Sequence, residues 1–534
     1  MKSAALALFM AALLTTANAA SRAAPYDVAE KDIATLQADL SAGRVTSAAL
    51  VRAYLKRIAR LDRAGPKLHA VIATNPNALA DAKALDAERK AKGARGPLHG
   101  IPILVKDNVE TGDPMPTTAG SLALADNVTG RDAPAVARLR AAGAIVLAKA
   151  NLSEWANIRS AHSLSGWSGI GGLVKNPYVL DRSACGSSSG SAAGVAASLG
   201  AAAIGSETDG SLVCPGSING VVAFKPTLGL VSRTHVVPIA HSQDTLGPMT
   251  RTVADAAILL AAMAGTDVDD KATLPADEVK ADYPAALAAF SLKGRRLGVL
   301  MPAEDDPPFL AALSALKGAG AEIVPITDFK PPASELGDKE LMVLEYELKN
   351  DLDAYLGGLP SSKMRALADV IAFNAQSPRE TALFGQDLFE AAEATQGLSD
   401  PVYIAARDDL KAASQDALDR LFASYRVDAI LRPTGSPSFR IDVVKGDGDT
   451  GSSSFLPATA GYPHLTVPMG LVHGLPVGLS VIGQPWADAR VLAIGHAFEQ
   501  AMPARQPPKY LKTLEDDPSV QRAFAPLGAS AGTH

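Results

Sequence analysis

Amphipathic helical segments alternate with short apolar strands along most of this chain, and this alternation restricts its fold more than any other feature. Residues 78–92 are rich in Ala, Lys and Glu and predict a helix, whereas 100–109 alternate in the manner of a strand. Residues 133–142 again predict a helix, and 144–147 predict a short buried strand. Such alternation is typical of an α/β fold whose sheet is largely parallel.

The same pattern continues towards the C-terminus and predicts one large domain. We expect two helices within 32–61, further helices at 192–199, 253–263 and 491–502, and strands at 296–300, 429–431, 465–467 and 478–482. Residues 267–290 and 327–400 are more polar and less regular, which indicates segments that line or cover a cleft. The expected fold is a single α/β domain over 20–534, with a central mixed, largely parallel sheet covered by helices on both faces. Its core would span 30–265 and 425–502, and its variable, substrate-side region would span 267–400.

Composition and charge exclude several classes of protein. Of the 534 residues, 47% are hydrophobic and 20% are charged, which is ordinary for a globular chain. The net charge of -6 and the absence of a basic block argue against a nucleic-acid partner. The nine histidines are scattered and no CxxC or HExxH motif occurs, so we expect no metal site.

The first 19 residues have the organisation of a secretory signal peptide. Lys2 supplies a positive start, residues 4–14 are apolar, and Ala17-Asn18-Ala19 has the small-x-small pattern of a cleavage site. The apolar run is too short to span a bilayer comfortably, although an uncleaved anchor is the alternative. We therefore expect cleavage after Ala19 and a soluble, secreted or periplasmic mature protein that does not bind membranes.

A loop rich in Gly and Ser, Gly166–Ser191, suggests two kinds of site that the details do not favour. It lacks the Lys and the GxGxxG spacing of phosphate-binding loops. Residues 186–190 match the GxSxG nucleophile elbow of α/β-hydrolases, which would make Ser188 the nucleophile of an esterase. However, the apolar strand that should precede such an elbow is missing, because residues 176–184 have the character of a turn.

Lys106 is a candidate base because it lies on an otherwise apolar strand. A serine hydroxyl needs a base to accept its proton, and burial favours a neutral lysine that can take this role. From spacing alone, a surface lysine at a strand end is the more common arrangement. Cys185 and Cys214 flank the serines of interest, and the sequence leaves open whether they form a disulfide or remain two buried thiols.

Several linked motifs, in the same order along the chain, resemble those of the amidase-signature family. Cys185–Ser191 falls on the family's GGSSGGS loop, Ser206–Leu212 on its T/S-D-x-G-G-S-I segment, and Gly100–Asp107 on its GIPxxxKD segment. Lys225-Pro226-Thr227 matches a KPT element, and Asp244 with Gly247-Pro248 resembles the D-x-x-G-P that follows. The resemblance covers roughly 30–265 and 425–502.

This resemblance implies a Ser-cisSer-Lys triad. It makes Ser211 the nucleophile, Ser187 the relay that follows a cis peptide bond after Gly186, and Lys106 the terminal base. The backbone N–H groups implied to hold the oxyanion are those of Thr208, Asp209, Gly210 and Ser211. The candidate substrate-binding side chains are those of Trp155, Ser188 and Asp209, although a tryptophan packed in the core is the more common arrangement for Trp155.

The chain departs from the family pattern at several positions. Cys185 and Ser189 replace glycines of the loop, Asp209 replaces a glycine, Glu207 replaces the usual Asp and Val213 stands where Arg is common. These variants resemble the bacterial peptide amidases, which remove C-terminal amides from peptides.

The function implied is hydrolysis of a carboxamide to a carboxylate and ammonia through an acyl-enzyme. It needs no cofactor, and the expected partner of the monomer is a small-molecule or peptide amide. Aryl- and fatty-amide hydrolases of the same fold, the esterase that uses Ser188, and a non-catalytic binding protein on this fold are the alternatives.

Overall fold

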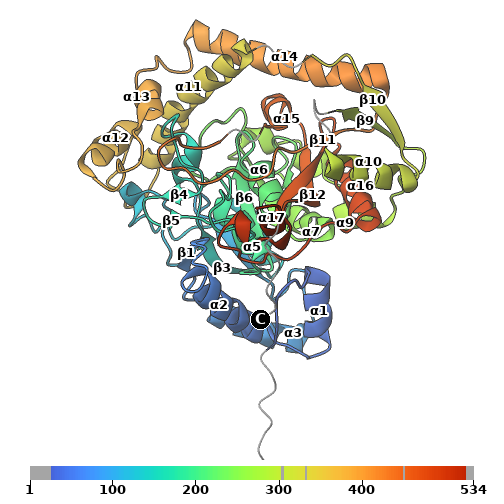
Figure 1. Cartoon of the computed structure of the whole chain (residues 1–534). Helices are drawn as coiled ribbons and strands as arrows, with labels where there is room; N and C mark the ends of the chain where they lie inside the picture. The colour runs from blue at the N-terminus through green and yellow to red at the C-terminus, as the bar shows by residue number, and fades with distance from the viewer. Residues whose placement is uncertain (1–25, 302–305, 331–333, 449–450, 525–534) are drawn as a thin grey trace, which may run out of the picture.

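The centre of the molecule is a mixed β-sheet, and the computed structural model describes residues 26–301, 306–330, 334–448 and 451–524 (Figure 1). Among these residues, eleven strands follow one another across the sheet in the order β1 (Val71–Thr74), β3 (Ile145–Ala150), β2 (Pro102–Lys106), β6 (Ala202–Glu207), β8 (Thr245–Thr250), β7 (Val222–Lys225), β12 (His464–Val472), β13 (Leu475–Ile482), β11 (Ala429–Pro433), β9 (Arg296–Leu300) and β10 (Glu322–Ile326). The short strands β4 (Trp167–Ser168) and β5 (Gly172–Leu173) pair separately. The predicted signal peptide lies outside the described residues.

Parallel pairing is confined to two parts of this sheet, where β2 lies between β3 and β6, and β9 lies between β10 and β11. The other six pairings of the described sheet are antiparallel. The mixed sheet is therefore confirmed, but the expectation that it is largely parallel is wrong. Helix–strand alternation predicts crossovers, whereas β12 and β13 are joined by the tight turn at His473-Gly474, where both residues have positive φ.

The helices around the sheet largely match the sequence pattern, and those predicted at 78–92 and 253–263 have these same bounds. The helices are α1 (Ile33–Ser41), α2 (Ser47–Arg57), α3 (Ala78–Lys92), α4 (Pro134–Ala141), α5 (Ser189–Ala196), α6 (Val213–Ile218), α7 (Val253–Met263), α8 (Ala276–Val279), α9 (Tyr283–Ala288), α10 (Pro307–Gly318), α15 (Phe455–Ala460), α16 (Asp488–Ala501) and α17 (Pro518–Phe524). No helix among the described residues is long and apolar enough to cross a bilayer.

Helices cover both faces of the sheet, as predicted. Gly216 of α6 lies against Thr466 of β12, whereas Gly495 of α16 lies against Leu465 and Val467 of the same strand. Because successive residues of a strand point to opposite faces, α6 and α16 lie on opposite sides of the sheet. The segment that follows β6 and leads into α6 is the one that carries the expected nucleophile.

The predicted variable region contains long helices. Residues 267–400 were expected to be irregular, but α11 (Glu335–Gly357) is a 23-residue helix, followed by α12 (Leu367–Gln376) and α13 (Asp387–Glu393). Together with the 25-residue α14 (Pro401–Tyr425), they lie along one side of the molecule in Figure 1. A buried stripe at helical spacing, which includes Leu348, Leu352 and Leu356, packs α11 into a hydrophobic cluster that is separate from the main core.

Candidate active site

Lys106 is a fully buried lysine at the end of β2. All five positions of this strand are buried, and the Lys106 Nζ donates hydrogen bonds to the Ser187 Oγ at 2.8 Å, the Ser206 Oγ at 2.9 Å and the Ser206 carbonyl oxygen at 3.1 Å. Burial lowers the pKa of Lys106 to about 7, although Asp244 and Glu207 act at longer range in the opposite direction. Because no carboxylate among the described residues forms an ion pair with it, Lys106 can lose its proton near neutral pH.

Ser187 lies in the glycine-serine loop and is held by its backbone. The peptide bond between Gly186 and Ser187 is cis, as the resemblance implied. The Ser187 carbonyl oxygen accepts a hydrogen bond from the Ser153 N–H at 3.1 Å. A Cβ at Gly186 would lie 2.1 Å from the Ser153 Oγ, so this position accepts only glycine without a shift of its neighbours.

Ser211 lies in a tight turn between β6 and α6. The Glu207 Oε2 accepts hydrogen bonds from the N–H groups of Leu212 at 2.7 Å and Val213 at 3.1 Å, which fixes the start of α6. The Ser188 N–H donates to the Ser211 carbonyl oxygen at 3.2 Å and so joins this turn to the loop that holds Ser187. The Ser211 hydroxyl has no hydrogen-bond partner within the described residues, and 9% of the surface of this residue is accessible to solvent.

The turn also presents backbone donors. The N–H groups of Thr208, Asp209 and Ser211 have no acceptor among the described residues, whereas the N–H of Gly210 is directed at the Glu207 carboxylate. Gly210 has φ of 76°, a conformation that glycine adopts readily. A turn with several unpaired N–H groups beside a serine hydroxyl can stabilise negative charge that develops on a carbonyl oxygen.

Thr208 is anchored by Asp244. The Thr208 Oγ1 donates to the Asp244 Oδ1 at 2.6 Å, while the Asp244 Oδ2 accepts from the N–H groups of Ile239 at 2.8 Å and Ala240 at 3.1 Å. Burial raises the pKa of Asp244 to about 6. One carboxylate therefore ties the turn that bears Ser211 to the loop over 239–244.

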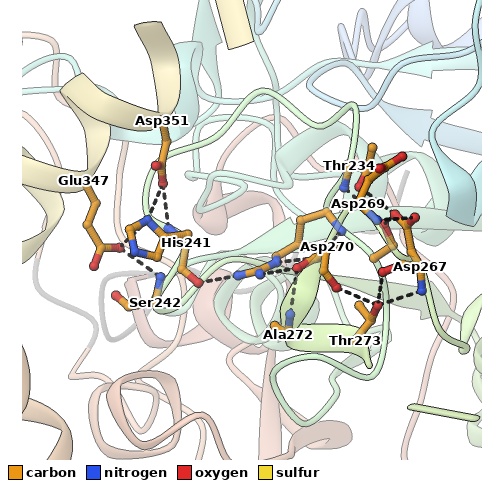
Figure 2. Close-up of polar contacts among 12 residues, drawn as sticks. Thr234, His241, Ser242, Asp267, Asp269, Asp270, Ala272, Thr273, Glu347 and Asp351 are labelled. Atoms are coloured by element: carbon orange, nitrogen blue, oxygen red, sulfur yellow. Dashed lines mark hydrogen bonds and ion pairs between the residues drawn. The ribbon is translucent and has the colours of Figure 1, made fainter. Parts of the chain in front are cut away.

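Figure 2 shows how that loop is attached to α11. The His241 Nδ1 lies 2.8 Å from the Asp351 Oδ2, and the Ser242 N–H donates to the Glu347 Oε2 at 2.9 Å. The hydrogen bond to Asp351 raises the pKa of His241. On its other side, the His241 carbonyl oxygen accepts from Arg233, which is paired with Asp270 at 2.5 Å.

His241, Glu347 and Asp351 also form the one group of three ligand-type side chains found among the described residues. Its atoms are already used within the protein, since Glu347 accepts from the Tyr403 hydroxyl at 2.8 Å and Asp351 accepts from the His241 backbone at 2.9 Å. These contacts form a hydrogen-bonded clamp between a loop and a helix.

Two of the predicted substrate-binding residues are enclosed by protein. Ser188 is fully buried, and its Oγ donates to the Ser206 carbonyl oxygen at 2.9 Å and accepts from the Ser206 N–H at 3.2 Å. This hydroxyl is therefore not presented to a substrate, in contrast to the serine of a nucleophile elbow. Trp155 is 3% exposed and packs edge-on against Phe389 of α13, with ring centroids 5.7 Å apart.

Asp209, the third predicted substrate-binding residue, has an acidic neighbour that sequence reasoning missed. Burial raises the pKa of Asp209 to about 6, and burial together with the charge of Asp209 raises the pKa of Glu340 to about 8. Gln243 donates to Glu340 at 2.8 Å. Glu340 belongs to α11, more than a hundred residues further along the chain. The polar, acidic sequence of this helix is typical of a solvent-exposed segment, so it gave no sign that Glu340 lies near Asp209.

A disulfide joins the two halves of the site. Cys185 and Cys214 are bonded, with their Cα atoms 6.1 Å apart. Cys185 lies two residues before Ser187, and Cys214 lies three residues after Ser211. The sequence had left this pairing open, and the structure places it across the segments that carry the two serines.

The comparisons with known proteins agree on one family. The family model described as Amidase matches residues 49–492. The crystal structure of a peptide amidase from Stenotrophomonas maltophilia superimposes with a TM-score of 0.85 at 47% identity, over 90% of this chain and 99% of that one. That of an amidase family protein from Bacillus anthracis superimposes with a TM-score of 0.83 at 34% identity, over 90% of this chain and 93% of that one. A protein of Arabidopsis thaliana named as a probable amidase is 39% identical over 94% of this chain and 96% of its own length.

Proposed function

This chain belongs to the amidase-signature family, whose members hydrolyse amides, and we propose that it cleaves C-terminal peptide amides to a carboxylate and ammonia. The contact that carries the proposal is the 2.8 Å hydrogen bond from the buried Lys106 Nζ to the Ser187 Oγ, beside the turn that bears Ser211. A neutral lysine in this position can accept a proton from a serine, which is the chemical requirement for an activated hydroxyl.

In this mechanism Lys106 accepts the proton of Ser187 as Ser187 accepts that of Ser211. The Ser211 Oγ attacks the amide carbonyl, and the N–H groups of Thr208, Asp209 and Ser211 stabilise the oxyanion. Loss of one such donor typically costs a factor of about 100–1000 in rate. Ser187 then passes its proton to the departing amide nitrogen and takes one back from the Lys106 ammonium, so that ammonia leaves and Lys106 is neutral again. Water, which loses a proton through the same relay, attacks the acyl-enzyme, and the proton returns to the Ser211 Oγ as the carboxylate is released.

Peptide amides are favoured over aryl or fatty amides because the similarity to the Stenotrophomonas maltophilia peptide amidase extends over 90% of the chain at 47% identity. The same triad can hydrolyse all three kinds of amide, so the choice of peptide amides rests on this similarity.

The test is ammonia release from an N-acetylated dipeptide amide by the purified mature chain and four variants. We expect Ser211→Ala, Ser187→Ala and Lys106→Ala each to lose at least about three orders of magnitude in kcat/KM. Ser188→Ala is the matched control, because its hydroxyl is enclosed, and it should retain most of the activity. Equal ammonia release by the wild type and Ser211→Ala would reject the proposal, and loss of activity only in Ser188→Ala would favour the esterase-type alternative.

We also propose that residues 1–19 direct export, that the mature enzyme acts as a monomer, and that it uses neither metal nor cofactor. The disulfide between Cys185 and Cys214 fits an oxidising compartment. Mass spectrometry of the periplasmic fraction should find an N-terminus at Ala20, and light scattering should give the mass of one chain. An intact N-terminus in the cytosolic fraction would contradict the export proposal.

A further inference from the structure

A cavity of about 380 Å³ lies between β11 and the helices α14 and α15, on the side of the molecule where Figure 1 shows these elements close together. Much of its lining is apolar and comes from Phe329, Leu418, Ile430, Phe455, Leu456 and Ile482. Arg432 is its one charged lining residue among those described. Such a combination suits a ligand with an apolar body and one anionic group.

Arg432 is a partly buried cation without an internal partner. No acidic side chain of the described residues forms an ion pair with its guanidinium, and burial alone accounts for the lowering of its pKa. Most other partly buried arginines here are paired, for example Arg233 with Asp270 and Arg140 with Asp113. A guanidinium that faces a cavity with all its donors available is suited to bind a carboxylate in a bidentate manner.

The strand register places this cavity on the same face of the sheet as the candidate nucleophile. One row of directly paired residues crosses four neighbouring strands, from Ala223 of β7 through Thr466 of β12 and Ser480 of β13 to Arg432 of β11. Directly paired residues share a face, and Gly216 of α6 lies against both Ala223 and Thr466. The helix that begins just after Ser211 therefore packs on the face from which Arg432 projects.

The cavity and the nucleophile turn also share a wall. A Cβ on Gly210 would lie 2.9 Å from the Ser454 Oγ and 4.0 Å from the Ser452 Oγ, and Ser452 lines the cavity. The neighbouring Ser453 is held by hydrogen bonds between its hydroxyl and the Thr434 carbonyl oxygen at 3.0 Å and the Ser480 hydroxyl at 2.8 Å. The segment over 452–454 thus separates the cavity from Gly210 by only one side chain.

We propose that this cavity is the subsite for the acyl portion of the amide substrate, and that Arg432 selects acyl groups that carry a carboxylate. This inference rests on the proposed function. The helix α6, which begins just after Ser211, packs on β7 and β12, and β11 lies three strand spacings of about 4.8 Å from β7, so the carboxylate would lie roughly 14 Å across the sheet from the β7 side of that helix. An extended peptide covers this span in about four residues, which makes an acidic side chain a few residues before the amide the expected ligand.

The experiment uses N-acetylated tetraleucine amides in which a single leucine is replaced. The replaced residue is the second, third or fourth from the amide, and it is either Glu or its neutral isostere Gln. We expect the wild type to prefer Glu at one of these positions by roughly 10- to 100-fold in kcat/KM, mainly through KM, since hydrogen bonds between charged groups are the stronger ones. Arg432→Met should abolish this preference, and Arg432→Lys should restore part of it. Arg440→Met, which changes an exposed arginine of the following segment, should leave the Glu-to-Gln ratio as in the wild type.

No preference for Glu at any position, or an equal preference in the wild type and Arg432→Met, would overturn the inference. These outcomes differ from failure of the proposed function, in which the wild type would release no more ammonia than Ser211→Ala from every peptide, including the neutral ones. A uniform loss of kcat/KM for all peptides in Arg432→Met, with the Glu-to-Gln ratio unchanged, would show that Arg432 supports the structure rather than the selection.

Discussion

A lysine ammonium that is enclosed by protein and paired with no carboxylate is unstable relative to its neutral form, and Lys106 is such a lysine. The sequence alone placed it on an apolar strand, which is correct, but an isolated strand does not reveal whether its last residue points to solvent. The decisive information is tertiary, because Ser187 and Ser206, eighty to a hundred residues away, supply the hydroxyl and carbonyl oxygens around its Nζ.

The pH dependence of activity should report this lysine. With a pKa of about 7, Lys106 loses its neutral, proton-accepting form as the pH falls, so kcat/KM should drop about tenfold per unit below pH 7 and level off above it. The measurement is kcat/KM for a neutral dipeptide amide between pH 5 and 9. Asp244→Asn is the control for a buried carboxyl group next to the nucleophile turn whose pKa is about 6, and this variant should retain the low-pH decline. A profile that is flat down to pH 5 would contradict Lys106 as the base.

At the scale of elements, the candidate site consists of two short segments that are held together by two independent links. The loop before α5 and the turn before α6 are joined by the Ser188-to-Ser211 hydrogen bond at 3.2 Å and by the disulfide between Cys185 and Cys214. Glycine and serine motifs predicted both segments, because tight turns and backbone donors require such residues. The pairing of the cysteines could not be derived, since two cysteines in one chain are equally compatible with free thiols.

Removal of the disulfide should destabilise the protein measurably. The bond closes a loop with a sequence separation of 29, for which the chain-entropy model gives roughly 3–4 kcal/mol. We expect the double variant Cys185→Ser/Cys214→Ser to unfold at a lower urea concentration than the wild type. Its free energy of unfolding should be lower by up to that amount. Dithiothreitol should lower the midpoint of the wild type and leave that of the double variant unchanged. Identical midpoints for the oxidised wild type and the double variant would show that the cross-link adds no stability.

At the scale of the whole molecule, the sequence predicted the single α/β domain and the helices on both faces, but it misjudged the balance of strand directions and the region over 267–400. Alternation of helices and strands implies crossovers only where consecutive strands are neighbours, and most neighbours in this sheet are not consecutive. In α11, acidic residues surround the buried stripe, so its helical period was obscured. The contributions of Glu340, Glu347 and Asp351 depend on where this helix docks, which local pattern does not specify.

The clamp between His241 and α11 predicts a pH-dependent attachment of this region to the core. The hydrogen bond to Asp351 raises the pKa of His241. A raised pKa in the folded state means that the stabilisation is complete below the unfolded value of about 6.5 and is lost as the pH rises through the folded value. His241→Gln should therefore lower Tm more at pH 5.5 than at pH 8.5, by an amount limited by solvent screening, since the His241 side chain is 44% exposed.

Differential scanning calorimetry of the mature chain at the two pH values measures this difference. Asp351→Asn should reproduce the pattern, because it removes the acidic partner of the same imidazole. His162→Gln is the matched control, since His162 is exposed and its side chain takes part in no ion pair among the described residues, and its Tm should follow the wild type at both pH values. If His241→Gln lowers Tm equally at pH 5.5 and 8.5, the imidazole contributes by packing or neutral hydrogen bonding, and the attachment of α11 does not depend on its charge.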